Sequence, residues 1–383
     1  MAHFTTPAHI ITGTGALPEA APYFRSMGKR AFIVTGKHVA VSAMMTMLRQ
    51  VLSIEQISYR VFDGITGEPT DTMIEQGLSL YKSSGCDFII GIGGGSPLDA
   101  AKAIAAMSVN PGSISAYNGV EITGDIPPVA AIPTTAGTGS EATKFTVITD
   151  SEKGVKMLLK GDALVPYLAV VDAQLSLGAP KSVTAATGLD ALTHAVEAYT
   201  SKKAMPLTDV LAVSAVKRIM RYLPVVYREP DNLFAREQMS IAALEAGICI
   251  NNSSVTIVHG MSRPIGALFH VPHGMSNAML LKECLRFAVS GAYEKFANLG
   301  RATGIAGEDD TDETAAKRFI DSLQQICDIC EIPTLEQYGI PKEEYISQID
   351  KMSADAIASG SPGNTVKAVT AEDCRQIYQK LYP

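Results

Sequence analysis

Four potential metal ligands lie in two short stretches of the second half of this 383-residue chain. Asp190 and His194 are four residues apart in GLDALTHAVEA, so a helix would place both side chains on one face. His259 and His273 follow in VHGMSRPIGALFHVPHG, where glycine and proline permit sharp turns. One carboxylate and three imidazoles suit Fe²⁺ or Zn²⁺ and leave a coordination position open. A lone histidine on an apolar helix is more often a core residue, but two clusters together favour a catalytic metal site.

A glycine turn in the first half could bind phosphate. Gly93, Gly94 and Gly95 follow the apolar run DFIIGI and precede SPLDAAKAIAAM, which has the pattern of a helix. Backbone N–H groups at a helix N-terminus attract phosphate. We expect Ser96 to cap this helix, and Asp99, three residues later, supports that start. A tight turn that binds no ligand would explain the three glycines about as well as a phosphate site does.

A second loop strengthens the phosphate interpretation. PTTAGTGSEAT (133–143) concentrates glycines and hydroxyl side chains directly after the apolar stretch VAAI. Two such loops at one edge of a parallel sheet would form a pyrophosphate cradle. The sequence therefore favours a dinucleotide cofactor.

The elements that position these residues differ between the two halves of the chain. Strand patterns alternate with helical ones up to about residue 178, which predicts a Rossmann-like parallel sheet in an α/β domain (1–178). Helical patterns dominate afterwards and predict an all-α domain (179–383), with a small-molecule site in the cleft between the domains. The expected strands are 30–36, 57–64, 86–92, 127–135 and 166–172, and the clearest helices are 38–53, 70–85, 206–227, 233–250 and 313–330.

Charge and composition exclude several classes of partner. The net charge is −7 with no basic block, which argues against nucleic acid and anionic membranes. No apolar run reaches the ~20 residues that cross a bilayer, and the N-terminus lacks a signal pattern, so we expect a cytoplasmic protein. Its cysteines form no disulfide framework. Cys327 and Cys330 form a CxxC that could be a redox or zinc motif, but without a second CxxC we expect core packing.

Four motifs, in this order, resemble the iron-containing alcohol dehydrogenases: GGGSPLDAAKA, IPTTAGTGSEAT, TAATGLDALTHAVEAYTS and the pair VHG and PHG. The resemblance covers nearly the whole chain. It implies the fold shared with dehydroquinate synthase, one divalent metal on Asp190, His194, His259 and His273, and a homodimer or larger assembly. It also implies hydride transfer between a nicotinamide and the carbonyl carbon of a small aldehyde, which the metal polarises as a Lewis acid.

The same resemblance implies which residues bind the cofactor. Gly94, Gly95 and Ser96 would hold the pyrophosphate, and Thr135, Thr138 and Ser140 would contact the phosphates, ribose or nicotinamide. We also expect Asp99 and Lys160 at the cofactor and Phe145 at the substrate.

The chain departs from the family pattern at Arg263, where relatives commonly have histidine in HGMAHP. Arginine stays protonated and offers a bidentate donor to a carboxylate, sulfonate or phosphonate. Ser254 and Thr256 add hydrogen-bond donors upstream. These residues predict a short aldehyde with an anionic group, such as sulfoacetaldehyde or succinic semialdehyde. The alternatives are that Arg263 only pairs with a carboxylate and braces the loop, or that the substrate is a neutral alcohol or diol.

Proton transfer needs another group if Arg263 replaces a histidine. His270, three residues before the last ligand, is a candidate relay, and solvent is an equal alternative.

Cofactor choice depends on two positions near the adenine ribose. Many relatives carry an aspartate where this chain has Gly36, which alone would permit NADP. Glu68 stands where relatives often have asparagine, and its carboxylate would disfavour a 2′-phosphate. We expect NAD, with NADP possible.

Two other classes of function compete with a dehydrogenase. A metal- and NAD-dependent lyase or cyclase of the dehydroquinate synthase type shares the fold, but it would need more basic residues for phosphorylated substrates. A non-catalytic metal- or nucleotide-binding protein would not need the intact four-ligand set.

Overall fold

The computed structural model describes residues 3–382 and divides the chain into two compact units. One unit comprises Thr5–Ala179, and the other comprises the chain from Pro180 together with the residues before Thr5. The division therefore falls one residue after the expected boundary at 178.

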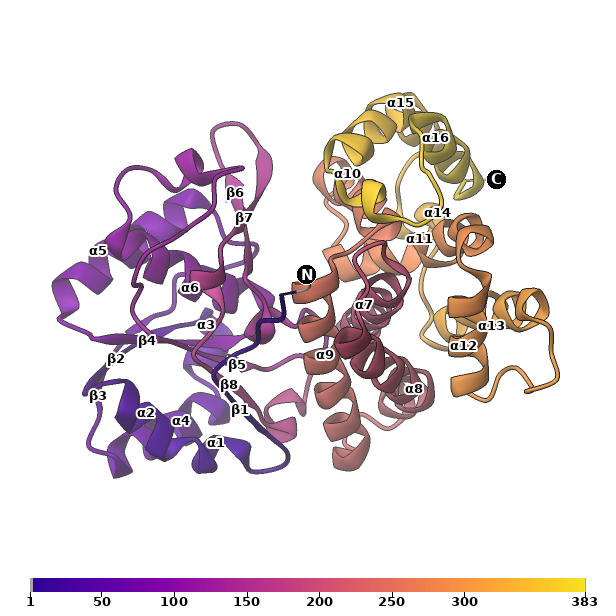
Figure 1. Ribbon diagram of the computed structural model, residues 1–383. Helices are drawn as coiled ribbons and strands as arrows, with labels where there is room; N and C mark the ends of the chain where they lie inside the picture. The colour runs from indigo at the N-terminus through magenta and orange to yellow at the C-terminus, as the bar shows by residue number, and fades with distance from the viewer. Residues whose placement is uncertain (1–2, 383) are drawn as a thin grey trace. The chain divides into compact units, whose positions relative to one another are not determined.

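A six-stranded parallel sheet forms the centre of the first unit, in the order β1-β8-β5-β4-β2-β3 (Figure 1). Five of these strands were predicted from apolar runs, and the prediction of a parallel sheet is confirmed. The strand at the N-terminus was missed because it has only four residues and its side chains are alternately exposed. The strands are β1 (His9–Thr12), β2 (Arg30–Val34), β3 (Ser58–Phe62), β4 (Phe88–Gly93), β5 (Val129–Pro133) and β8 (Leu168–Val171).

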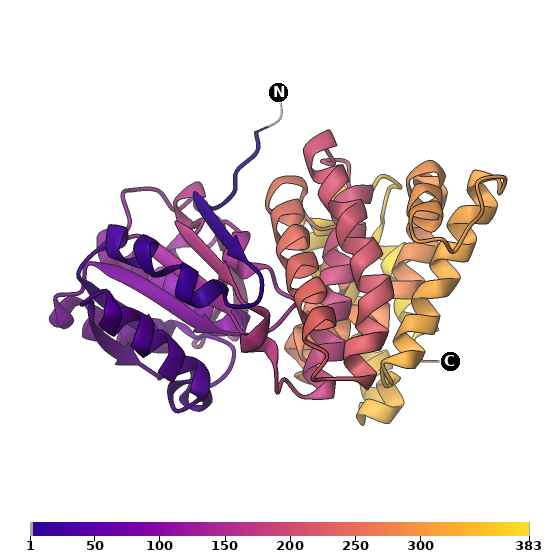
Figure 2. The ribbon, with the colours of Figure 1, turned by 90° about the horizontal axis from the view of Figure 1, so that it is seen from below.

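Helices cover both faces of this sheet (Figures 1 and 2). One buried cluster joins α5 and α6 to one face, and a second joins α1, α2 and α4 to the other. The first-unit helices are α1 (Ala16–Glu19), α2 (Ala21–Met27), α3 (Lys37–Ala40), α4 (Ala43–Ile54), α5 (Asp71–Ser84) and α6 (Gly95–Val109). Short 3₁₀ turns are η1 (Ile114–Tyr117), η2 (Ser140–Ala142), η3 (Asp162–Leu164) and η4 (Ala173–Ser176).

Two helix starts differ from the prediction. The helix expected over 38–53 is interrupted after Ala40, and α4 begins behind Ser42, whose hydroxyl caps it. Ser96 was the wrong cap, because α6 already begins at Gly95 with Gly94 as its N-cap. The chain turns at Gly93, where φ is +147° and a β-carbon would lie 2.8 Å from Pro97, so the helix starts earlier than a serine cap would allow.

An antiparallel hairpin, β6 (Phe145–Asp150) and β7 (Val155–Lys160), was not predicted. Its strands alternate between buried and more exposed side chains, the pattern of a ribbon with one covered face. The hairpin carries two predicted site residues, Phe145 and Lys160, which are directly opposite each other in the ladder.

The second unit is helical throughout its described residues, as predicted. Its central helix, α7, is almost entirely buried beyond its first turn. Its elements are α7 (Lys181–Thr200), α8 (Pro206–Arg228), α9 (Leu233–Ser253), α10 (Ile257–Phe269), α11 (His273–Ala288), η5 (Val289–Gly291), α12 (Tyr293–Ala302), α13 (Asp312–Ile329), α14 (Leu335–Tyr338), α15 (Lys342–Ala358), η6 (Ser361–Asn364) and α16 (Ala371–Lys380).

Cys327 and Cys330 are buried at the end of α13, and burial raises the pKa of each thiol to about 12. The expected core role of this CxxC is confirmed.

Within residues 3–382, no single helix has both the length and the apolar character needed to cross a membrane; only the bent pair α9 and α10 meets these criteria when taken together.

Candidate metal centre and cofactor-binding loops

The four predicted ligands converge at one point in the helical unit. Asp190 and His194 lie one turn apart in α7, His259 lies in the first turn of α10, and His273 begins α11. Their donor atoms all lie within 4.8 Å of one another, and Asp190 Oδ1 is 3.6 to 3.8 Å from each Nε2. Two ligands about 2.1 Å from one tetrahedral ion are roughly 3.4 Å apart. The set therefore fits a divalent ion after small inward shifts.

Exposure at this centre is uneven. The side chains of Asp190, His194 and His259 are at most 6% exposed, whereas that of His273 is 41% exposed. The His273 side is therefore the open side of the centre, as an ion that binds a substrate oxygen requires.

Glu197, which the sequence analysis missed, holds His259 in place. Its Oε2 lies 2.6 Å from His259 Nδ1, and its Oε1 accepts hydrogen bonds from the Thr256 hydroxyl (2.7 Å) and the Val258 N–H (2.6 Å). A proton on Nδ1 that is donated to Glu197 leaves the Nε2 lone pair for a metal. Glu197 follows His194 by three residues on the same helical face, and that spacing could have identified it.

Charge stabilises this arrangement. Burial lowers the tendency of Glu197 to ionise, but His259 and the hydrogen bonds outweigh burial and hold the pKa of Glu197 below its usual value. Burial alone would also lower the pKa of His259, yet Glu197 and Asp190 raise it to about 9. For His273, desolvation of the ring and the neighbouring histidines lower the pKa to about 3, although 41% of the side chain is exposed.

Asn277, one turn after His273 in α11, is a second residue that the sequence analysis missed. Its amide Nδ2 donates to Asp190 Oδ1 at 2.7 Å and lies 3.2 Å from His259 Nε2 and 3.3 Å from His273 Nε2. Because its side chain is fully buried, Asn277 fixes the orientation of the Asp190 carboxylate.

Arg263 lies in α10, one turn beyond His259. Its Nη1 donates to the Ser361 hydroxyl at 3.0 Å, and within residues 3–382 it forms no ion pair with a carboxylate. Burial lowers the pKa of its guanidinium, and Glu197, whose charge raises that pKa, already accepts from three donors. The alternative role of Arg263, pairing with a carboxylate and bracing the loop, finds no direct ion pair within residues 3–382, although its bond to Ser361 does brace the chain there.

The segment Ser361–Thr365 packs beside α10 and contributes to this region. A β-carbon on Gly260 would lie 2.5 Å from Pro362, so glycine is required for the contact. Asn364 Nδ2 donates to the Ser254 hydroxyl (3.2 Å) and to the Val255 carbonyl (3.0 Å). The sequence could not reveal Ser361 or Asn364, because they are about 100 residues from their partners.

Three other predicted residues of this unit have different surroundings. Thr256 is 2% exposed and its hydroxyl donates to Glu197, so the expectation that it lines a substrate pocket is corrected. Ser254 ends α9 with φ +65° and its hydroxyl accepts from Asn364. His270 ends α10 in the left-handed conformation and is exposed, and its role as proton relay stays a prediction.

In the α/β unit, the two predicted phosphate loops lie side by side at the carboxyl ends of β4 and β5. A β-carbon on Gly95 would lie 2.8 Å from the Thr138 methyl group, and one on Gly94 would lie 3.8 Å from the Thr135 hydroxyl. Ser96 follows in the first turn of α6. These residues form a turn with few side chains at a helix N-terminus, the kind of site that can bind a pyrophosphate.

Asp99 and Ser140 contact each other instead of facing outward. The Ser140 hydroxyl donates to Asp99 Oδ1 at 2.5 Å, and Asp99 Oδ2 accepts from the Val147 N–H at 2.8 Å. Ser140 is 5% exposed. Direct contacts of either side chain with a nucleotide are therefore not supported, and both act within the protein.

At the ends of β2 and β3, Gly36 forms a bridge with Gly64, and a β-carbon on Gly36 would lie 2.8 Å from the Ile65 carbonyl oxygen. An aspartate would not fit there without a backbone shift. Glu68 forms an ion pair with Lys156 of β7, with both carboxylate oxygens 2.8 Å from Nζ. The Glu68 charge is therefore partly neutralised, which weakens the expected repulsion of a 2′-phosphate.

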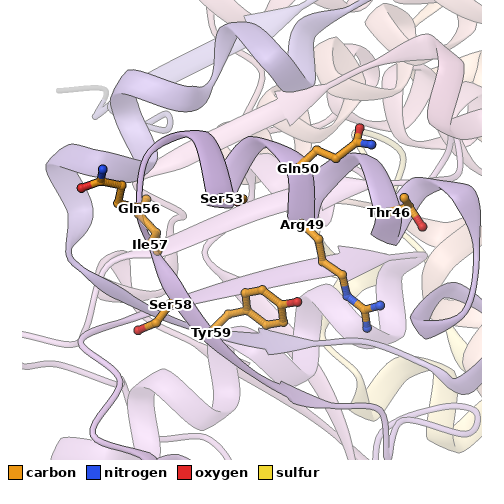
Figure 3. A pocket seen from close by; sticks show the side chains of 8 residues that line it. All are labelled: Thr46, Arg49, Gln50, Ser53, Gln56, Ile57, Ser58 and Tyr59. Carbon is orange, nitrogen blue, oxygen red and sulfur yellow. The ribbon is translucent and has the colours of Figure 1, made fainter.

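A pocket of the α/β unit, of about 560 Å³, lies elsewhere (Figure 3). Arg49 of α4 and Tyr59 of β3 lie in it, the guanidinium 5.9 Å from the ring centre. It is at the amino end of β3, whereas the phosphate loops follow the carboxyl ends of strands. This pocket is therefore separate from the predicted cofactor site.

Comparisons with known proteins find similar proteins over both units of the chain. Residues 7–173 match the family model "iron-containing alcohol dehydrogenase", and residues 184–382 match the model of its C-terminal region. A 1,3-propanediol dehydrogenase of Citrobacter freundii is 36% identical over 92% of both chains. A crystal structure of a 1,3-propanediol oxidoreductase is 32% identical, with a TM-score of 0.96 over the full length of both chains. The structure of a sulfoacetaldehyde reductase of Bifidobacterium kashiwanohense with NAD⁺ is 26% identical, with a TM-score of 0.89 over 100% of this chain and 98% of that one.

Replacing Glu197 tests how the metal centre is held. Glu197→Gln keeps the side-chain shape but loses the charge that fixes the His259 tautomer, so we expect the affinity for Zn²⁺ or Co²⁺ to fall about 10- to 100-fold. Competition with a chromophoric chelator measures this affinity. Glu245→Gln, a carboxyl in α9 that bonds Ser214, is the matched control and should retain wild-type affinity. Equal affinities of the wild type and Glu197→Gln would refute the role of Glu197.

Proposed function

The chain belongs to the iron-containing alcohol dehydrogenase family and is an oxidoreductase of that class, and we propose that it reduces a short aldehyde bearing an anionic group. The observation that carries this proposal is the half-buried guanidinium of Arg263, which donates to the Ser361 hydroxyl and forms no direct ion pair within the described part of the chain. The carboxylate of Glu197 acts on it from a longer range and already accepts from three donors. A desolvated cation without a counter-ion is costly, and a carboxylate or sulfonate on the substrate would compensate it. The reaction would run between this aldehyde and the corresponding primary alcohol.

The helical unit supplies the electrophilic and substrate-binding residues. Asp190, His194, His259 and His273 would hold one divalent ion, Fe²⁺ or Zn²⁺, which polarises the carbonyl when it is bound. Arg263 would bind the anionic end of the same substrate. Asn277 orients the Asp190 carboxylate and Glu197 orients the His259 ring. Ser361 accepts a hydrogen bond from the Arg263 guanidinium and holds it in place.

The α/β unit would bind the nicotinamide cofactor. Gly94, Gly95 and Ser96 at the start of α6 would bind the pyrophosphate, with Thr135 and Thr138 beside them. Phe145 and Lys160, paired across the hairpin, are proposed at the substrate and the cofactor respectively. We propose NAD as the cofactor with NADP accepted, homodimers or larger assemblies, and a cytoplasmic location.

A neutral alcohol or diol is the second candidate substrate. It is favoured by the similarity to 1,3-propanediol dehydrogenase, whereas the similarity to a sulfoacetaldehyde reductase favours an anionic aldehyde. The cyclase alternative is set aside, because the family models that match are those of alcohol dehydrogenases.

Substitution of Arg263 distinguishes the two substrates. For Arg263→Ala, we expect kcat/KM for sulfoacetaldehyde or succinic semialdehyde to fall about 10- to 100-fold more than kcat/KM for a neutral aldehyde of equal length, because a charge-assisted contact is lost. NADH oxidation at 340 nm measures both rates. Arg286→Ala, which removes a surface arginine of α11 paired with Glu283, is the control and should leave the ratio unchanged. An equal loss for both aldehydes would contradict an anionic substrate.

The Glu68–Lys156 pair gives a prediction about cofactor choice. We expect the wild type to prefer NADH, and Glu68→Gln to raise kcat/KM for NADPH relative to NADH about 3- to 10-fold, because Lys156 becomes free to meet a 2′-phosphate. Lys156→Met should remove this gain in the double variant. A strong preference of the wild type for NADPH would show that Glu68 does not select the cofactor.

A further inference from the structure

A completely buried lysine, Lys102 of α6, has no role in the reaction described above. It is 0% exposed, and its Nζ lies 2.9 Å from the Ser140 carbonyl, 3.2 Å from the Thr143 carbonyl and hydroxyl, and 2.5 Å from the Phe145 carbonyl. These four oxygens can accept the N–H donors of the lysine. Burial lowers the pKa of Lys102, while the carboxylates of Asp99, 3.6 Å from Nζ, and Glu141 favour its protonated form. Lys102 thus binds the stretch of chain that runs from η2 to the first residue of β6.

Asp99, one turn earlier on α6 and 3.6 Å from Lys102 Nζ, contacts the same segment. Its carboxylate accepts from the Ser140 hydroxyl and the Val147 N–H, and its carbonyl accepts from the Thr146 hydroxyl at 2.9 Å. Four contacts from Lys102 and three from Asp99 therefore fix residues 140–147 on α6. We call this set of contacts the α6 clasp.

The α6 clasp is directly connected to the phosphate loops. The Thr138 hydroxyl, two residues before the clasped segment, accepts from the Ser140 N–H at 3.3 Å. The Thr138 methyl group packs on Gly95 at the start of the same helix. A shift of residues 140–147 would therefore move Thr138 relative to the helix N-terminus that would bind pyrophosphate.

We propose that Lys102 and Asp99 are positioning residues for the nicotinamide cofactor, which set the spacing between the N-terminus of α6 and the loop that carries Thr135 and Thr138. A buried lysine contributes little to stability compared with a methionine of similar volume, because the charged group loses its hydration. Stability of the fold therefore does not explain Lys102. The clasp instead selects one conformation of the 135–147 segment. This proposal rests on the proposed binding of a dinucleotide by the α/β unit.

Cofactor binding to the full-length protein, without substrate, tests the proposal. NADH fluorescence gives the dissociation constant with and without Zn²⁺, and hydrogen exchange reports on residues 140–147. For Lys102→Met, we expect Kd for NADH and NADPH to rise about tenfold or more and exchange of residues 140–147 to increase, with Zn²⁺ affinity unchanged. Asp99→Asn should raise Kd by a smaller factor. Lys153→Met, which removes an exposed lysine of the hairpin turn, should match the wild type.

The possible results distinguish the role of the α6 clasp from the proposed binding of a dinucleotide. A folded Lys102→Met protein with Kd within twofold of the wild type would overturn the role of the α6 clasp. If Lys102→Met does not fold, Asp99→Asn and Thr143→Val decide by the same criterion, since each removes part of the clasp without burying a new charge. A wild type that binds neither NADH nor NADPH would instead refute the proposed function.

Discussion

The buried contact between Glu197 and His259 is the interaction on which the metal centre depends. A carboxylate that is completely removed from solvent is unstable unless donors surround it, and three donors do so here. The donors belong to Thr256, the N-cap of α10, and to the first turn of that helix, so the same contact fixes where the helix starts. His259 and, one turn later, Arg263 are thereby placed relative to the ligands of α7.

In the α/β unit a buried basic side chain, Lys102, has a role similar to that of the buried carboxylate of Glu197. Lys102 is buried as a cation among carbonyl oxygens, and Asp99 accepts from the same stretch of chain. In both units a buried charge fixes a loop or a helix start that carries the functional groups. Removing one partner leaves the other buried and unsatisfied, so these groups are expected to be much less tolerant of substitution than the surface ion pairs.

Much of this organisation could be predicted from the sequence, where the information is local. The spacing of Asp190 and His194 predicted two ligands on one helical face, and the glycines after β4 predicted a turn into a helix. The Ser96 cap was wrong, because the conformation of Gly93 decides where α6 begins. Thr256 was misplaced in the substrate pocket, because its hydroxyl is used by Glu197, 59 residues away. Ser361 was not found, since only the tertiary fold brings it to Arg263.

The central claim is that one metal ion, held by the four convergent ligands, makes this chain a reductase of aldehydes. It is tested most directly by measuring aldehyde-dependent NADH or NADPH oxidation of chelator-treated protein during titration with Fe²⁺ or Zn²⁺, alongside Asp190→Ala. The account predicts that activity returns in proportion to metal up to one ion per chain and that Asp190→Ala stays inactive. Full activity without metal, or an active Asp190→Ala protein, would contradict it.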